Sequence, residues 1–135
     1  KAVIFHEFIR SGEKIGEVLT RDRIGHERLW SGTKDPGAVR RRFLEDPGCT
    51  VLAANSKSGA FGLNLQVANY EIFYESPVSP IVRAQAEARC YRTGQTKTTW
   101  IYDVVVAGSV EEKILAYIKE GRDLMKAIID GSESL

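Results

Sequence analysis

The sequence predicts an α/β domain whose parallel sheet is covered by helices on both faces. Short apolar runs, typical of strands buried in a parallel sheet, alternate along the chain with amphipathic helical patterns. A chain of 135 residues can form one such domain with a substantial core. We expect the domain to cover residues 1–130 and residues 131–135 to form a flexible tail.

Two strands and two helices are expected in the first part of the chain. Residues 2–5 are a short apolar run and form the first strand. Apolar residues at helical spacing indicate a helix over 11–21, with Ser11 as its N-cap. Residues 27–30 form a second, shorter strand. Pro36, a residue well suited to the first helical position, then begins the second helix.

Three more strands follow the second helix, over residues 50–54, 70–74 and 98–106. The last helix opens with a capping box, in which Ser109 is the N-cap and Glu112 follows three residues later. Gly121 is expected to kink or interrupt this helix. The alternation of strands and helices is what favours a parallel sheet over an antiparallel one.

Composition and charge exclude several classes of protein. Hydrophobic residues make up 43% and charged residues 27% of the sequence, as in an ordinary soluble globular domain. Because the formal net charge is only +1, any nucleic-acid binding must come from local patches. Cys49 and Cys90 lie far apart, which indicates neither a zinc site nor a disulfide framework. No apolar run is long enough to span a membrane. The chain opens at Lys1 directly onto a strand, so we expect a domain excised from a longer protein.

The strongest candidate for a functional site lies in a stretch that predicts a helix ending at Gly94. On that helix Gln85, Arg89 and Arg92 share one stripe, since each residue turns by about 100°. Guanidinium groups are almost never buried without a partner, and their forked donors suit phosphate oxygens. The stripe is therefore either the solvated face of an amphipathic helix or an arginine pair directed at a nucleoside triphosphate.

The loop after the third strand is rich in glycine. Gly59 and Gly62 leave backbone amides open to close approach by an anion or by another backbone. The spacing fits neither the dinucleotide fingerprint G-x-G-x-x-G nor a P-loop, because no Gly-Lys-Ser/Thr follows. On its own, the loop is as consistent with a plain turn as with an anion site.

Three segments together resemble the motifs of one family. Residues 85–95 resemble motif VI of the Swi/Snf-like ATPases, a branch of the superfamily-2 helicases and DNA translocases. Residues 55–65 resemble motif V of that family, and the first strand resembles motif IV with His6 in place of a serine. The tryptophan that usually follows motif V is missing after Glu75, which indicates a divergent bacterial or phage-like branch rather than a chromatin remodeller. The matched positions are Gln85, Ala86, Arg89, Arg92, Gly94 and Gln95 in motif VI and Gly59, Gly62, Asn64 and Leu65 in motif V.

The resemblance implies the C-terminal RecA-like lobe of such an ATPase, with the fold of a P-loop NTPase helicase lobe. In the family, the two motif VI arginines reach across a cleft to ATP held by the other lobe. Arg89 and Arg92 would therefore act as arginine fingers, and Gln85 would help to position them. Gly59 would also approach the nucleotide.

The same resemblance implies contacts to a nucleic-acid backbone through Ser56, Lys57 and Ser58. Its partners would be double-stranded DNA and the N-terminal RecA-like lobe of the same protein, with no membrane partner. The chain has no Walker A lysine and no Walker B acidic pair. ATP and Mg²⁺ would thus be bound mainly by the N-terminal lobe, this lobe would hold no metal, and alone it would be inactive. The expected location is the cytoplasm, the nucleoid or host cytoplasm for a phage protein, and the nucleus for a eukaryotic one.

Two alternatives remain open. A non-catalytic nucleic-acid-binding module of the same fold would hold DNA without hydrolysing ATP. An unrelated small-molecule-binding α/β domain, such as a glycosyltransferase or dinucleotide-binding lobe, would use neither motif. Two smaller features are equally open: His6 either finishes a strand or contacts a ligand, and residues 40–42, three arginines, form either a solvated face or a phosphate patch.

Overall fold

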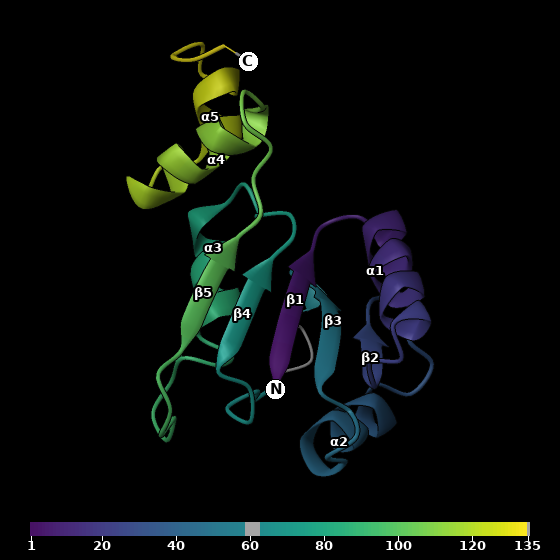
Figure 1. Ribbon diagram of the computed structural model, residues 1–135. Helices are drawn as coiled ribbons and strands as arrows, with labels where there is room; N and C mark the ends of the chain where they lie inside the picture. The colour runs from purple at the N-terminus through teal and green to yellow at the C-terminus, as the bar shows by residue number, and fades with distance from the viewer. Residues whose placement is uncertain (59–62, 135) are drawn as a thin grey trace.

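Five short strands form a single parallel sheet in the order β2-β3-β1-β4-β5 (Figure 1). The computed structural model describes residues 1–58 and 63–134. The order places β1 in the centre, because connections run first to one side of it and then to the other. The strands are β1 (Ala2–His6), β2 (His26–Leu29), β3 (Val51–Asn55), β4 (Tyr70–Phe73) and β5 (Trp100–Asp103).

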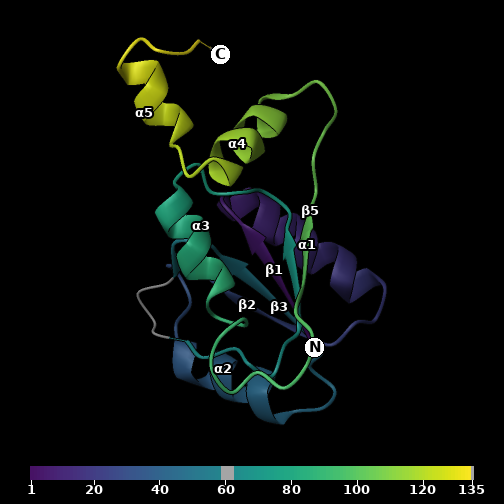
Figure 2. The ribbon, with the colours of Figure 1, turned by 90° about the vertical axis from the view of Figure 1, so that its left-hand side faces the viewer.

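The helices lie on both faces of the sheet and at one end of it (Figures 1 and 2). Ile15 and Leu19 of α1 pack with Ala53 on one face. Phe43 of α2 and Ala86 of α3 belong to the larger core on the opposite face. The parallel sheet with helices on both faces is therefore confirmed. The helices are α1 (Ile9–Arg21), α2 (Pro36–Glu45), α3 (Pro80–Glu87), α4 (Val110–Lys119) and α5 (Leu124–Ile129).

One part of the sheet is left open to solvent. In the register of β4 and β5, Tyr70 lies beside Trp100 and Ile72 beside Tyr102, all on the face that carries α1. Tyr70, Trp100 and Tyr102 are exposed. Helices thus cover this face over β1 and β3 but not over the outer pair of strands.

The beginning of α1 differs from its prediction. The helix starts at Ile9, so Ser11 lies in its first turn and is not the N-cap. The N-cap position is held by Phe8, which supplies no side-chain cap. Instead, a carboxylate oxygen of Glu75 accepts hydrogen bonds from the backbone amides of Glu7 (2.9 Å) and Phe8 (3.2 Å), and the other oxygen accepts one from the Ser11 hydroxyl (2.5 Å). A carboxylate just after β4 therefore accepts from the amides of the N-cap residue Phe8 and of Glu7 before it.

The last two helices follow the predicted pattern more closely. Ser109 is the N-cap of α4, but its side chain accepts from the amide of Glu111, not from that of Glu112. Glu111 also reaches back to the amide of Val106 (2.9 Å). Gly121 has a φ of +69° and ends the helix, so that α5 is a separate helix.

Residues after α5 contact the preceding helices. The Ser132 amide donates to the carbonyl oxygen of Ala127 (2.9 Å), and the Tyr117 hydroxyl donates to the carboxylate of Glu133 (2.8 Å). The domain boundary at residue 130 stays a prediction.

Candidate nucleotide and nucleic-acid site

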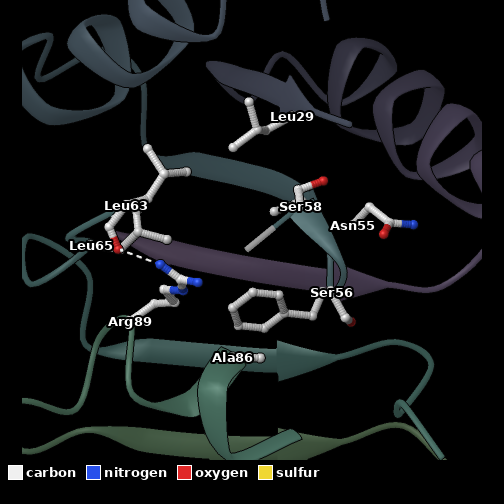
Figure 3. A pocket seen from close by; sticks show the side chains of 10 residues that line it. Leu29, Asn55, Ser56, Ser58, Leu63, Leu65, Ala86 and Arg89 are labelled. Carbon is white, nitrogen blue, oxygen red and sulfur yellow. Dashed lines mark hydrogen bonds between the residues drawn. The ribbon is translucent and has the colours of Figure 1, made fainter. Parts of the chain in front are cut away.

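The two segments with candidate site residues meet at the carboxyl end of the central strands. A small hollow is lined by Asn55, Ser56 and Ser58, which end or follow β3, and by Ala86 and Arg89 from α3 and the turn after it (Figure 3). The Ser56 amide donates to the carbonyl oxygen of His6, at the end of β1 (3.0 Å). In open parallel sheets, ligands bind in crevices at this end of the strands.

The predicted helix through Gly94 is wrong, because α3 ends at Glu87. If the helix continued, the carbonyl oxygen of Arg89 would accept from the amide four residues later. That oxygen instead accepts from the Leu65 amide (2.9 Å), and the carbonyl oxygen of Cys90 accepts from the Gln95 side chain (3.2 Å). Tertiary contacts thus take the acceptors that the helix needs. Arg89 and Arg92 consequently lie on a turn of residues 88–94, which we call the arginine turn.

The three motif VI side chains nevertheless come together. Gln85, Arg89 and Arg92 line one open hollow with Ala88. Arg89 also lines the hollow of Figure 3, where its guanidinium points toward the carbonyl oxygen of Leu63 at 3.5 Å. Arg92 is exposed, and among the described residues no carboxylate lies within ion-pair distance of it. Arg92 is therefore accessible to an anion from outside the domain.

Side-chain amides tie the arginine turn to the segment after the glycine loop. The Gln95 side chain donates to the carbonyl oxygens of Gln66 (3.1 Å) and Ala68 (2.9 Å), besides that of Cys90. In return, the Gln66 side-chain amide donates to the carbonyl oxygen of Thr93. Together with the bond between Leu65 and Arg89, these contacts make residues 63–68 and the arginine turn one structural unit.

A third arginine, which sequence reasoning did not single out, is the one that is held inside the domain. Arg83 on α3 is only 5% exposed and donates two hydrogen bonds to Asp103 (2.6 and 3.2 Å) and one to Glu87 (2.7 Å). Its guanidinium also lies 3.6 Å from the ring centroid of Phe73. Burial opposes the charge, but the hydrogen bonds to the two carboxylates outweigh it and raise the pKa of Arg83. Its spacing of four residues from Glu87 was the available signal.

The candidate nucleic-acid residues differ in accessibility. Lys57 is exposed, with its ammonium 4.0 Å from the carboxylate of Glu7. Ser58 is half-buried, and Ser56 is buried. Burial raises the pKa of Glu7, although the Ser56 hydroxyl and the Lys57 charge both act against that shift. Lys57 is thus the member of this group best placed to meet a phosphate.

Some predicted positions are not part of the described hollow. Gly59 and Gly62 lie outside the described residues. His6 is buried, and a ring nitrogen lies 2.9 Å from the carbonyl oxygen of Phe8. Its ring packs so closely on Gly12 that a Cβ there would lie 2.5 Å from it. His6 therefore fixes β1 against α1, which favours the structural interpretation.

The run of three arginines on α2 is partly neutralised. Arg42 forms ion pairs with Glu27 and, at 3.5 Å, with Asp46. Arg40 and Arg41 are exposed. Across the residues that the structure describes, no group of three acidic, histidine or cysteine side chains could hold a metal ion. Within the same residues, no helix is long and apolar enough to cross a membrane.

Known proteins are similar to this chain in sequence and in fold. The chain is 33% identical to the helicase SWR1 of Candida glabrata over 135 residues, which cover 98% of this chain and 9% of that protein. It is 29% identical to the chromatin-remodeling ATPase INO80 of Schizosaccharomyces pombe, across 99% of this chain and 8% of that protein. A crystal structure of the C-terminal part of the Fun30 ATPase domain superposes with a TM-score of 0.81 at 31% identity, covering 86% of this chain and 38% of that one. The chain is homologous to the C-terminal region of the Swi2/Snf2-family ATPases.

The Swi2/Snf2 relationship confirms the expected family and the RecA-like fold. It also argues against an unrelated small-molecule-binding domain. No protein-family model matches the chain. The chain spans only 8–9% of the length of the two relatives named above. The bacterial or phage-like branch stays a prediction.

Proposed function

We propose that this chain is the C-terminal lobe of a DNA-dependent ATPase and translocase, and that it supplies arginine fingers to an ATP site completed by an N-terminal P-loop lobe. The observation that carries the proposal is the exposed guanidinium of Arg92, which shares a hollow with Arg89 and Gln85. Homology to proteins named as helicases and remodeling ATPases supports the reaction class.

The chemistry assigned to this lobe is charge stabilisation. As the terminal phosphoryl group transfers to water, negative charge develops on its oxygens, and a guanidinium stabilises that charge with forked hydrogen bonds. An arginine supplied across an interface increases the rate by about 10³ to 10⁵ in other nucleotide hydrolases. Arg92 suits this role best, since Arg89 is half-buried and also contacts Leu63. Gln85 would hold the direction of the pair.

ATP and Mg²⁺ would be held mainly by the N-terminal lobe. Mg²⁺ needs oxygen ligands from carboxylates or from phosphates, and the described residues of this chain offer no acidic cluster for it. We expect this lobe to contribute no metal ligand and to be inactive by itself.

Double-stranded DNA is the proposed second partner. Lys57 offers an exposed ammonium next to the hollow that Arg89 lines, with Ser56 and Ser58 beside it in sequence. The contacts would be to phosphates, because a lysine ammonium recognises charge and not base sequence. Closure of the two lobes around ATP and their opening after hydrolysis would then move this segment along the duplex. The expected location follows the source: nuclear in a eukaryote, cytoplasmic otherwise.

The test substitutes Arg92→Ala in a polypeptide that contains both lobes. DNA-stimulated ATP hydrolysis should fall by at least about 10³-fold in kcat, while DNA affinity stays within about twofold. Arg41→Ala is the matched control, since it removes an exposed arginine of α2 that does not line this hollow. Unchanged hydrolysis in the Arg92 variant would remove the assignment. DNA binding without any turnover in the unsubstituted protein would favour the non-catalytic nucleic-acid-binding module instead.

A further inference from the structure

A buried carboxyl group lies beneath the arginine turn. Glu71 is in the middle of β4, between Val3 of β1 and Ile101 of β5 in the sheet register, and is 0% exposed. Both of its carboxyl oxygens are buried without a hydrogen-bond partner among the described residues. The Cys90 thiol and the Tyr91 backbone amide are close enough to influence it, although neither makes a hydrogen bond to it in ordinary geometry, and the Tyr91 amide donates to the carbonyl oxygen of Glu87 at 3.0 Å. An ionised carboxylate in such a place is strongly disfavoured.

The charges around Glu71 do not provide it with a partner. Arg83 and Glu87 of α3 face it, but Arg83 already binds Asp103 of β5 and Glu87. Burial raises the pKa of Glu71 to about 8, with Glu87 adding to the shift and Cys90, Arg83 and Tyr91 opposing it. Burial and the neighbouring Glu71 raise the pKa of the Cys90 thiol, while the N-terminal ammonium acts against this. At neutral pH the pair therefore consists of an uncharged carboxylic acid facing an uncharged thiol.

Cys90 is the residue through which this carboxyl group can act on the two arginines. It is 0% exposed and belongs to the large core, whereas Tyr91 and Arg92 after it are exposed. It is thus the buried anchor of the arginine turn. The carbonyl oxygens of Arg89 and Cys90 accept hydrogen bonds from the Leu65 amide and the Gln95 side chain. Because of these bonds, a displacement of Cys90 cannot be absorbed by local unwinding of the turn.

We propose that Glu71 is a positioning residue for the arginine turn: in its protonated form it seats Cys90 and so sets the direction of Arg89 and Arg92, and loss of its proton to solvent unseats the turn. The inference rests on the proposed function in one respect, which is the role of Arg89 and Arg92 as arginine fingers. A carboxylate at this point must gain water or draw the Cys90 and Tyr91 donors toward itself, and either movement displaces the backbone that carries Arg92.

The first test follows the backbone amides of residues 89–93 by NMR between pH 6.5 and 9.5 in the 135-residue chain. In the unsubstituted chain these amides should shift with a common midpoint near pH 8. Glu71→Gln keeps the shape without a titrating proton and should abolish the transition, as should Glu71→Val if the amide is poorly accommodated. Glu87→Gln is the matched control for the neighbouring carboxylate and should retain it. A transition that persists without Glu71, or its absence from the unsubstituted chain, would overturn the proposal.

The second test measures ATP hydrolysis against pH in the two-lobe polypeptide. If only the protonated form is competent, kcat of the unsubstituted protein should be about tenfold lower at pH 9 than that of Glu71→Gln, with equal values near pH 6.5. Equal pH profiles would overturn the positioning role. The outcome is separable from that of the proposed function. If Arg92→Ala leaves hydrolysis unchanged, the arginine-finger assignment fails, while the amide titration still decides whether Glu71 sets the turn.

Discussion

Replacing Arg83 by methionine should be among the most destabilising single changes in this domain. The substitution keeps most of the aliphatic length but removes three hydrogen bonds to carboxylates, one to the Ser76 hydroxyl at 3.0 Å, and the stacking on Phe73. Breaking a buried ion pair by removing one partner costs about 3–5 kcal/mol. The carboxylates of Asp103 and Glu87 are 27% and 34% exposed and can regain water, so we expect the lower end, about 3 kcal/mol.

Urea denaturation followed by circular dichroism at pH 7 measures this loss directly. Thermal unfolding gives a second measure. For a chain of 135 residues, the entropy of unfolding is about 0.28 kcal/mol per kelvin, so a loss of about 3 kcal/mol should lower the melting temperature by about 10 °C. Arg21→Met is the matched control, because Arg21 is highly exposed and its ion pair in the described part of the chain is with its exposed neighbour Asp22; it should cost less than about 1 kcal/mol. If the Arg83 variant unfolds within about 0.5 kcal/mol of the original chain, or loses no more than the control, Arg83 does not hold α3 in the way described.

Substitutions at three further residues test other contacts. Gln95→Ala removes a side chain that donates to three carbonyl oxygens and should cost about 2 kcal/mol by urea denaturation. Gln95→Glu should cost more, because an ionised carboxylate cannot donate a hydrogen bond. If both variants are as stable as the original chain, Gln95 does not join the two segments. Glu75→Ala leaves the amides of Glu7 and Phe8, just before α1, without their acceptor and should cost about 1–2 kcal/mol. The rise in hydrogen exchange should be largest at these two amides, and a uniform rise would contradict this. For Glu71 the pKa in the folded state, about 8, lies above the ordinary value of 4.5, so the native state holds one more proton than the unfolded state between these pH values. The free energy of unfolding should therefore fall by up to about 1.4 kcal/mol per pH unit as the pH rises from 4.5 to 8. Glu71→Gln should remove this dependence on pH.

The strands could be read from the sequence because their signal is local. The clearest examples, β1 and β3, contain short apolar runs. The predicted ranges differ from the observed ones by a residue at the first four strands and by more at β5, where 98–106 shortens to Trp100–Asp103. Pro36 and Gly121 likewise act through their own backbone preferences, and both mark helix ends as predicted.

The failures share a different cause, which is a partner distant in sequence. Ser11 has a cap-forming side chain, but the carboxylate at the start of the helix belongs to Glu75, which follows the neighbouring strand β4 and lies 64 residues later in the sequence. Arg89 has good helical neighbours, yet its carbonyl oxygen is bound by Leu65. The spacing of four residues pointed to Glu87 as one partner of Arg83, but its second carboxylate, Asp103, lies 20 residues away and depends on the fold, as does the exposure of Arg92.

The hydrogen bonds between residues 63–68 and residues 88–94 have a consequence for linkage. A ligand that displaces either segment must displace the other, because Leu65, Gln66 and Gln95 join their backbones directly. By thermodynamic reciprocity, if one ligand changes the affinity of the second by some factor, the second changes the affinity of the first by the same factor. The coupling free energy between the two segments is therefore limited by the strength of the few hydrogen bonds that join them, most of which come from amide side chains.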